Sequence, residues 1–392
     1  MNNNFLSLIK GGANLSRPMV LYQMRNDAKQ LTTTLTHSWS ELCGKKDLII
    51  ETVNTRISML PDIHRLIGYN PLQMMYDNHR YHFNLIIQIM KLQDFDMLIN
   101  MIPWVYRTYH IHGFHYDYFP IAFHQWIKAI EEHLKSNEAQ SLSLVYHFLI
   151  KWHPALVDLV ETNRDIGLSF HGDLQKEHEQ FLHYLLQGDY KNCILYSEKN
   201  VKTPADLAPF YLQVIQPALY RVGFLWQIGE ISVAIEHLST AIVSRIMASL
   251  YTRFPLIDTK YGNAVITSAP NEFHEVGGRI VADLLEIEGW NVDYIGTNIP
   301  QQDLLEHLKG KKPFLFGLSV TMPYLIENAR QIIWSVKNDP DLNAIKIMVG
   351  GLAFFHTTNL WQKIGADGWA SIGLEAVKLA NSWWNEANSL DV

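Results

Sequence analysis

Apolar positions recur at two different spacings along this chain and divide it into three stretches. From about Arg17 to Glu161 they recur every three or four residues, as in the run Phe83, Ile86, Ile87 and Met90, a spacing typical of helices. Prolines mark the expected helix starts and joins, and no alternating strand pattern interrupts the run. The pattern predicts an all-α domain over residues 1–162.

The second stretch, from about Gly167 to Phe254, predicts shorter helices, enough for four. Thr203-Pro204-Ala205-Asp206 is typical of a helix start, with a capping hydroxyl, a proline and an acidic residue. A later helix carries a predicted buried stripe at steps of three and four residues. The stripe consists of Ile231, Ile235, Leu238, Ile242, Ile246 and Leu250. A four-helix domain is expected over residues 163–258.

Beyond Asn263 the sequence pattern changes to short β-rich runs that alternate with helical segments. The runs are AVITSA, NVDYIG, FLFGLSV, IKIMVGG and GWASIG. This alternation predicts a doubly wound parallel α/β sheet, a Rossmann-like domain over residues 259–392. Ligands of such sheets bind beyond the carboxyl ends of the strands, so the residues after each run are the candidate site.

Composition narrows the class of protein without naming it. At 392 residues, with 48% hydrophobic and 12% aromatic residues, the chain is expected to fold into two or three domains. A net charge of −7 without any basic run argues against nucleic acid as a partner. The first residues lack an export signal, and no apolar stretch approaches a membrane span. Cys43 and Cys193 lie far apart, which argues against a disulfide framework or a zinc site. A cytoplasmic protein is expected.

Chemistry-bearing residues follow three of the predicted strands. Glu272 and His274 follow the first, where the imidazole could ligate a metal while the carboxylate holds the proton of the other ring nitrogen. Gly277 would let this loop approach a bulky ligand. Ser319 and Thr321 end the third strand, and Gly350-Gly351 end the fourth. Each also has a plainer interpretation, as a hydrogen-bonded loop histidine, a helix cap or a turn.

Taken together, the ExHxxG, SxT and GG motifs closely resemble the cobalamin-binding domain. The resemblance implies that His274 is the lower axial cobalt ligand and that the nucleotide tail runs beside the SxT and GG loops. The family's motif usually begins with Asp, so the extra methylene of Glu272 predicts a looser contact to the imidazole.

A second pattern lies upstream, where Trp226 is followed by nine residues and then Glu236-His237. It resembles the four-helix cap of light-responsive cobalamin-dependent repressors, which implies that Trp226 and Glu236 line an adenosyl group on the upper face of the corrin. Val233, His237 and Phe273 join them as candidate cofactor-binding residues. Gln227 stands where those repressors have a His that ligates cobalt after photolysis, so no bis-His state through that position is expected. His237, water or no ligand are the alternatives for the upper face. The alternative is a helix-end core tryptophan beside a solvated Glu-His pair.

The first domain contains a dense aromatic and histidine segment from Trp104 to Trp126. The segment resembles globin-like sensor domains, and three alternatives stay open: haem, a non-covalent linear tetrapyrrole, or no chromophore. The candidate haem ligands are His79, His82, His110 and His124. The candidate bilin contacts are Arg107, Tyr109, His110, His112, His115 and Tyr116.

The order of the three domains resembles that of the photocobilins, photoreceptors that use cobalamin and biliverdin. This implies a non-enzymatic, adenosylcobalamin-dependent light sensor in which photolysis of the cobalt–carbon bond changes cap packing. Oligomeric state, or the affinity for a separate effector protein, would change in turn. The alternative is a corrinoid carrier that shuttles methyl groups between methyltransferases.

Overall fold

The computed structural model describes residues 17–32, 39–162, 175–254, 258–355 and 359–389. The chain forms two compact units, Met1–Leu168 and Ser169–Val392, and each is described by itself. The predicted boundary between residues 162 and 163 borders residues 163–174, which lie outside the described ranges.

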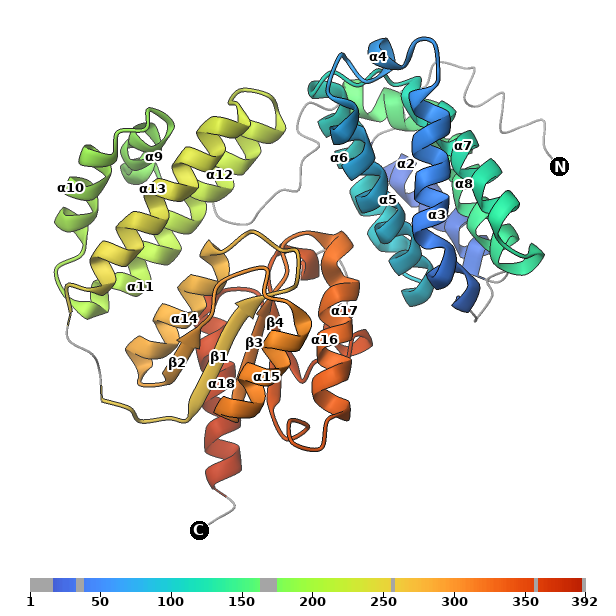
Figure 1. Cartoon of the computed structure of the whole chain (residues 1–392). Helices are drawn as coiled ribbons and strands as arrows, with labels where there is room; N and C mark the ends of the chain where they lie inside the picture. The colour runs from blue at the N-terminus through green and yellow to red at the C-terminus, as the bar shows by residue number, and fades with distance from the viewer. Residues whose placement is uncertain (1–16, 33–38, 163–174, 255–257, 356–358, 390–392) are drawn as a thin grey trace. The chain divides into compact units, whose positions relative to one another are not determined.

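The N-terminal unit is helical throughout its described part, as the apolar spacing predicts (Figure 1). Its core contains large aromatic side chains, of which Phe83, Tyr106, Phe114, Trp126 and Tyr146 are almost fully buried. The helices are α2 (Arg17–Thr32), α3 (Ser40–Ser58), α4 (Ile63–Leu66), α5 (Leu72–Leu92), α6 (Phe95–Ile111), α7 (Tyr118–His133) and α8 (Ser136–Thr162). The finer expectation of a globin-like arrangement stays a prediction.

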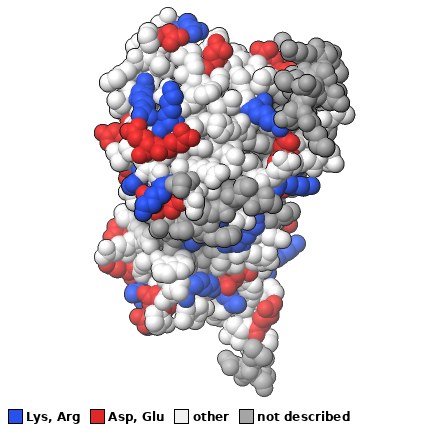
Figure 2. Space-filling view, turned by 90° about the vertical axis from the view of Figure 1, so that its right-hand side faces the viewer, with Lys and Arg blue, Asp and Glu red and all other residues white. Residues whose placement is uncertain are grey.

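Acidic and basic side chains are intermixed on the surface drawn in Figure 2. Within the N-terminal unit, Lys151 pairs with Asp27 and Arg25 pairs with Asp96. This face therefore presents mixed charge, in keeping with the scattered lysines and arginines of the sequence.

The second unit begins with a helical region, defined as residues 176–251. Its elements are η1 (Lys176–His178), α9 (Glu179–Leu186), α10 (Tyr190–Asn200), η2 (Pro204–Asp206), α11 (Leu207–Phe210), the π-helical turn η3 (Tyr211–Ile215), α12 (Gln216–Gln227) and α13 (Val233–Tyr251). A capping box between Thr203 and Asp206 confirms the predicted helix start. The wide turn η3 fits Pro217, because proline lacks the N–H of a regular helical bond and its ring crowds the preceding turn.

The five predicted strands are confirmed and form one parallel sheet in the order β2-β1-β3-β4-β5. They are β1 (Asn263–Ser268), β2 (Asn291–Tyr294), β3 (Leu315–Ser319), β4 (Lys346–Gly350) and β5 (Gly368–Ala370). The connecting elements are α14 (Val276–Glu288), α15 (Gln301–Lys311), η4 (Pro323–Leu325), α16 (Ile326–Asn338), η5 (Leu352–Phe354), α17 (Leu360–Lys363) and α18 (Gly373–Asn388). Helices α14 and α18 cover one face, and α15 and α16 cover the other (Figure 1).

The helical region and the sheet domain share one hydrophobic core within the second unit. Ile246 and Leu250 of α13 belong to the same buried cluster as Val276 and Ile280 of α14. The face of the sheet covered by α14 and α18 therefore also supports the helical region.

Helix α13 corrects two expectations from the sequence. Among the described helices it alone is long and apolar enough to cross a membrane by length and composition, whereas the sequence was expected to contain no such stretch. The predicted stripe is buried only in the second half of the helix, at Ile242, Ile246 and Leu250. Leu238 in the first half is 46% exposed, so this end of α13 presents apolar surface that the described chain does not cover.

Candidate functional site

The candidate site begins at the loop that leaves the carboxyl end of β1. The His274 side chain is 54% exposed and the preceding Phe273 is 70% exposed. The Oγ of Ser268 at the end of β1 donates a hydrogen bond to the carbonyl of His274 (3.3 Å). The loop therefore presents an accessible imidazole from a backbone that is tied to the sheet.

Glu272 organises this loop from inside, because it is only 1% exposed. Its Oε1 lies 2.5 Å from Nδ1 of His274 and accepts hydrogen bonds from the backbone N–H groups of Phe273 and His274. Its Oε2 accepts from the backbone N–H groups of Thr321 (2.8 Å) and Met322 (3.0 Å), in the loop after β3. One carboxylate thus fixes the imidazole and joins two neighbouring loops.

The prediction that the longer Glu272 side chain would loosen its contact with the imidazole is wrong. The contact is short, and the second oxygen of the same carboxylate bonds to the β3 loop. Sequence reasoning did not find the role of the Met322 backbone N–H, because a backbone donor leaves no motif.

The electrostatics of the pair favour a charged carboxylate and a basic imidazole. Burial raises the pKa of Glu272, but the hydrogen bonds from His274 and the backbone outweigh it, so the pKa lies below its usual value. Burial lowers the pKa of His274, but the bond to Glu272, its charge and the charge of Glu236 raise it overall. With Nδ1 facing Glu272, Nε2 is the ring nitrogen available to a ligand.

The predicted small and hydroxyl residues gather at the same edge of the sheet. Ser319 ends β3 beside Gly350, which ends β4. Gly351 adopts φ 98°, and a Cβ there would lie 2.3 Å from the carbonyl oxygen of Val320, so only glycine fits. A Cβ on Gly277 would meet nothing within 4 Å, so the chain around Gly277 leaves open space.

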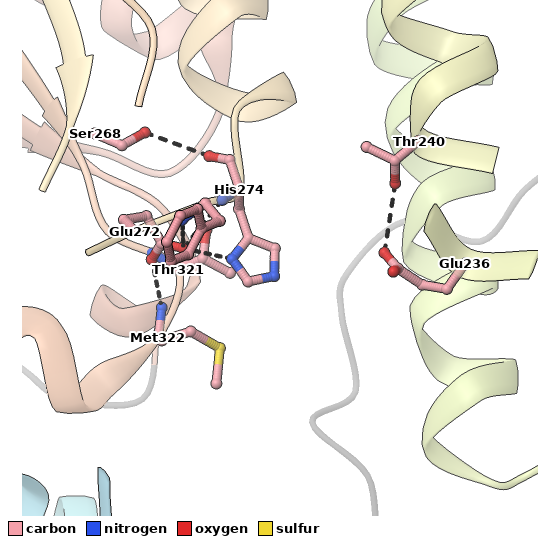
Figure 3. Close-up of polar contacts among 8 residues, drawn as sticks. Glu236, Thr240, Ser268, Glu272, His274, Thr321 and Met322 are labelled. Carbon is pink, nitrogen blue, oxygen red and sulfur yellow. Dashed lines mark hydrogen bonds and ion pairs between the residues drawn. The ribbon is translucent and has the colours of Figure 1, made fainter. Parts of the chain in front are cut away.

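Figure 3 shows His274 facing α13, from which Glu236 and Thr240 project. Thr240 Oγ1 donates to Glu236 Oε1 (3.4 Å). His237 lies 3.1 Å from Glu236 through its Nδ1, and its side chain is 76% exposed. Val233 is 52% exposed at the start of α13. The structure therefore brings Glu236, of these candidates, to the side of the unit that His274 faces.

Trp226 lies at the end of α12, half-buried. The side chain of its neighbour Gln227 is buried, and the amide nitrogen has no hydrogen-bond partner in the described structure. An orphaned donor at this point fits a site that a ligand completes.

The candidate bilin residues mostly pack around the α6–α7 turn. The rings of His110 and Tyr116 stack at 4.1 Å, and Tyr109 contacts Phe114 at 4.9 Å. The backbone of this turn is tied to the turn before α5: Asn70 donates to the carbonyl of His112, and the N–H of His115 donates to the carbonyl of Leu66. Arg107 is buried on α6. These ring contacts give Tyr109, His110 and Tyr116 a packing role, and biliverdin stays a prediction.

The donor set fits a corrinoid better than a bare metal ion. Among the described residues, no three His, Cys, Asp or Glu side chains are grouped to hold an ion. A corrinoid brings the equatorial ligands of its cobalt and needs one axial donor from the protein, which His274 can supply. Gly277, three residues after His274, has no atom within 4 Å of a Cβ placed there, so this end of the loop leaves room for a bulky ligand.

Comparisons with known proteins agree with this fit. A family model described as a B12 binding domain matches residues 262–378, and a second with the same description matches residues 177–251. Dimethylamine corrinoid protein 3 of Methanosarcina acetivorans is 27% identical over 168 residues, which are 42% of this chain and 78% of the relative. Its namesake in Methanosarcina mazei is 31% identical over 123 residues, 31% of this chain and 72% of the relative.

The solved structure of the Methanosarcina barkeri monomethylamine corrinoid protein aligns with 52% of this chain and 96% of its own, at 18% identity and a TM-score of 0.45. The family models and the relatives show the class to which the second unit belongs. The chain is a member of the family of B12-binding corrinoid proteins.

The expectation of a light-sensing function is contradicted by these relatives. They are named as dimethylamine corrinoid proteins, which supports the alternative that the sequence left open, a corrinoid carrier. Their names agree with the expectation that the chain is not itself an enzyme. The family model over residues 177–251 spans the Trp-x9-Glu-His pattern, and the corrinoid contacts of these three residues stay a prediction.

Proposed function

We propose that this protein holds a cobalt corrinoid between its helical region and the carboxyl edge of its sheet, and carries methyl groups between partner proteins. The observation that supports it most is the His274–Glu272 pair, an accessible imidazole fixed by a buried carboxylate and facing α13. The corrinoid relatives named for dimethylamine favour methyl transfer over other uses of a corrinoid.

Each side chain of the site has a distinct task in this proposal. His274 offers Nε2 to the cobalt, and Glu272 accepts the hydrogen bond from Nδ1–H, which keeps that proton on Nδ1 and orients the ring. Gly277, around which a Cβ would meet nothing within 4 Å, would leave space for the bulk of the cofactor. When bound, the cobalt supplies a centre that takes up a methyl group from one partner and releases it to another.

The helical region would cover the side of the site opposite His274. Trp226 supplies a flat apolar surface that excludes water, and the exposed first half of α13 supplies apolar contacts from Val233 and Leu238. Glu236 places a carboxylate on that side, at a position where its charge acts on His274. Methyl transfer requires that a partner reach this side, so the helical region is the surface that a methyltransferase approaches.

Reconstitution with hydroxocobalamin and methylcobalamin tests the binding part of the proposal. The wild type is expected to retain one corrinoid per chain through gel filtration, with the absorption spectrum of a histidine-ligated form. His274→Ala is expected to lose that spectrum. His307→Ala is the matched control, because His307 also pairs with a carboxylate, Asp293, at 3.0 Å in the same domain. A histidine-ligated spectrum that persists in His274→Ala contradicts the assignment.

The carrier role is tested separately with the reduced, corrinoid-loaded protein. Incubation with dimethylamine and a dimethylamine:corrinoid methyltransferase is expected to produce the absorption band of a methylated corrinoid on this chain. The His274→Ala protein, loaded to the same extent, is the comparison. A wild type that binds corrinoid but is never methylated by any methylamine methyltransferase contradicts the carrier role and leaves binding intact.

Two finer predictions about cofactors are tested with the same protein. An adenosyl upper ligand predicts that adenosylcobalamin is retained more tightly than methylcobalamin. Biliverdin in the N-terminal unit predicts a red-shifted, protein-bound absorption after biliverdin is added. Equal retention of the two corrinoids and an unchanged biliverdin spectrum would remove both predictions.

A further inference from the structure

Helix α13 carries a polar stripe on the side that faces the sheet domain. Glu236, Thr240 and Ser244 follow one another at intervals of four residues, so their side chains lie along one face of the helix. The first two are bonded to each other opposite His274 (Figure 3). The third reaches the sheet domain itself.

Ser244 Oγ donates a hydrogen bond of 2.5 Å to Oε1 of Glu275. This contact joins the helical region to the residue that directly follows His274. Arg279, one turn into α14, adds a long bond of 3.5 Å to the backbone carbonyl of Ser244. Two groups of the α14 N-terminus therefore meet the same residue of α13.

Glu275 is held from the sheet side as well. Its backbone carbonyl accepts a hydrogen bond from the Tyr294 hydroxyl (2.9 Å) and one from the backbone N–H of Arg279 (3.1 Å). With its side chain fixed by Ser244, Glu275 leaves the adjacent His274 backbone little freedom to rotate.

We propose that Ser244 is a positioning residue for His274, acting through Glu275, and that α13 thereby couples the two sides of the corrinoid site. The inference rests on the proposed function and deepens it. The same helix face presents Glu236 to one side of the site and fixes the loop of the axial ligand on the other. When Glu236 is displaced and α13 moves with it, the hydrogen bond from Ser244 to Glu275 transmits the movement to the residue next to His274.

Hydrogen exchange on the protein without corrinoid tests the coupling directly. In Ser244→Ala, the backbone amides of residues 272–279 are expected to exchange about tenfold faster, because a hydrogen bond to a charged carboxylate is lost. Ser244→Thr retains a hydroxyl at the same position and is expected to restore the wild-type rate.

Ser239→Ala is the matched control on the same helix. The Ser239 hydroxyl bonds to the carbonyls of Ile235 and Leu185, both inside the helical region. Its loss is expected to leave exchange of residues 272–279 unchanged. Equal acceleration in both variants would mean that a loosened helical region explains the effect, and would overturn the inference.

The corrinoid-loaded protein gives the second readout. Electron paramagnetic resonance of the singly reduced cobalt reports whether a histidine nitrogen is bound. Ser244→Ala is expected to raise the ratio of histidine-free to histidine-bound cobalt about fivefold at unchanged corrinoid content, and Ser244→Thr to reverse this. A wild type that takes up no corrinoid overturns the proposed function. Normal uptake with an unchanged ratio in Ser244→Ala overturns only this inference.

Discussion

The contact between Tyr211 and Asp283 offers the sharpest test of the electrostatics within the second unit. Tyr211, at the start of the π-helical turn, donates its hydroxyl to Oδ2 of Asp283 on α14 (2.9 Å). Both side chains are buried. Burial raises the pKa of Asp283 from 3.8 to about 6, against the opposing effects of the Tyr211 bond and the Arg279 charge, while Glu286 adds to the rise.

The expected magnitude follows from that pKa. Because the folded protein binds this proton more tightly than the unfolded chain, Asp283 does not lower stability below about pH 4. Its charge destabilises the fold progressively as the pH rises through 6. A pKa raised from 3.8 to about 6 corresponds to about 3 kcal/mol of lost stability above pH 7, since one pKa unit is worth about 1.4 kcal/mol.

Asp283→Asn removes the charge and keeps an oxygen that can accept from Tyr211. We expect this variant to match the wild type near pH 4 and to exceed its free energy of unfolding by up to about 3 kcal/mol near pH 7.5. Urea denaturation followed by tryptophan fluorescence measures the difference, and peptide-resolved hydrogen exchange of α14 assigns it to the second unit. A difference that does not change between pH 4 and 7.5 would refute the reasoning.

Three further predictions follow from other parts of the molecule. Glu272→Ala should lower the free energy of unfolding by about 2–4 kcal/mol, because it leaves buried N–H donors of two loops without an acceptor; urea denaturation measures the loss. Gly351→Ala should lower the melting temperature by several degrees, since its Cβ would collide with the backbone at φ 98°. Gly277→Ala is the control and should leave the melting temperature unchanged, because open space surrounds that position. Burial lowers the pKa of His79 to about 3 and that of His82 to about 4. The N-terminal unit should therefore lose stability below pH 6.5, because its unfolded form takes up these protons. Far-ultraviolet circular dichroism should show acid unfolding, and its midpoint should lie at a lower pH in His82→Phe.

The sheet could be predicted from the sequence because every strand carries its own signal. Runs such as AVITSA and FLFGLSV are short, rich in β-branched or aromatic residues, and bounded by turn residues. Each can therefore be predicted as a strand from local sequence alone. The order of parallel strands then places His274 and Ser319 at one edge. Local pattern and topology together were sufficient to predict the part of the candidate site that lies at the edge of the sheet.

The part of the candidate site on α12 and α13 and the N-terminal unit were less predictable, because their residues lie on helices. A helical stripe indicates a buried face but not what covers it. Leu238, in the first half of α13, is 46% exposed although the stripe runs through it. The aromatic segment around Tyr109 and Tyr116 has the composition of both a ligand cleft and a packed core, and the described contacts are those of packing. The link from Ser244 to Glu275 joins residues 31 positions apart and leaves no sequence motif.

Glu272 shows why a motif comparison can misjudge a substitution. Measured against the usual Asp, one added methylene moves the carboxylate away from the backbone, which suggested a weaker hold on His274. That argument treats the imidazole as the only partner. In the structure the carboxylate lies between two loops, and its second oxygen accepts two backbone N–H groups beyond β3. The carboxylate therefore joins two loops, a role that the motif does not encode, and the position of Oε1 beside Nδ1 is set from both sides.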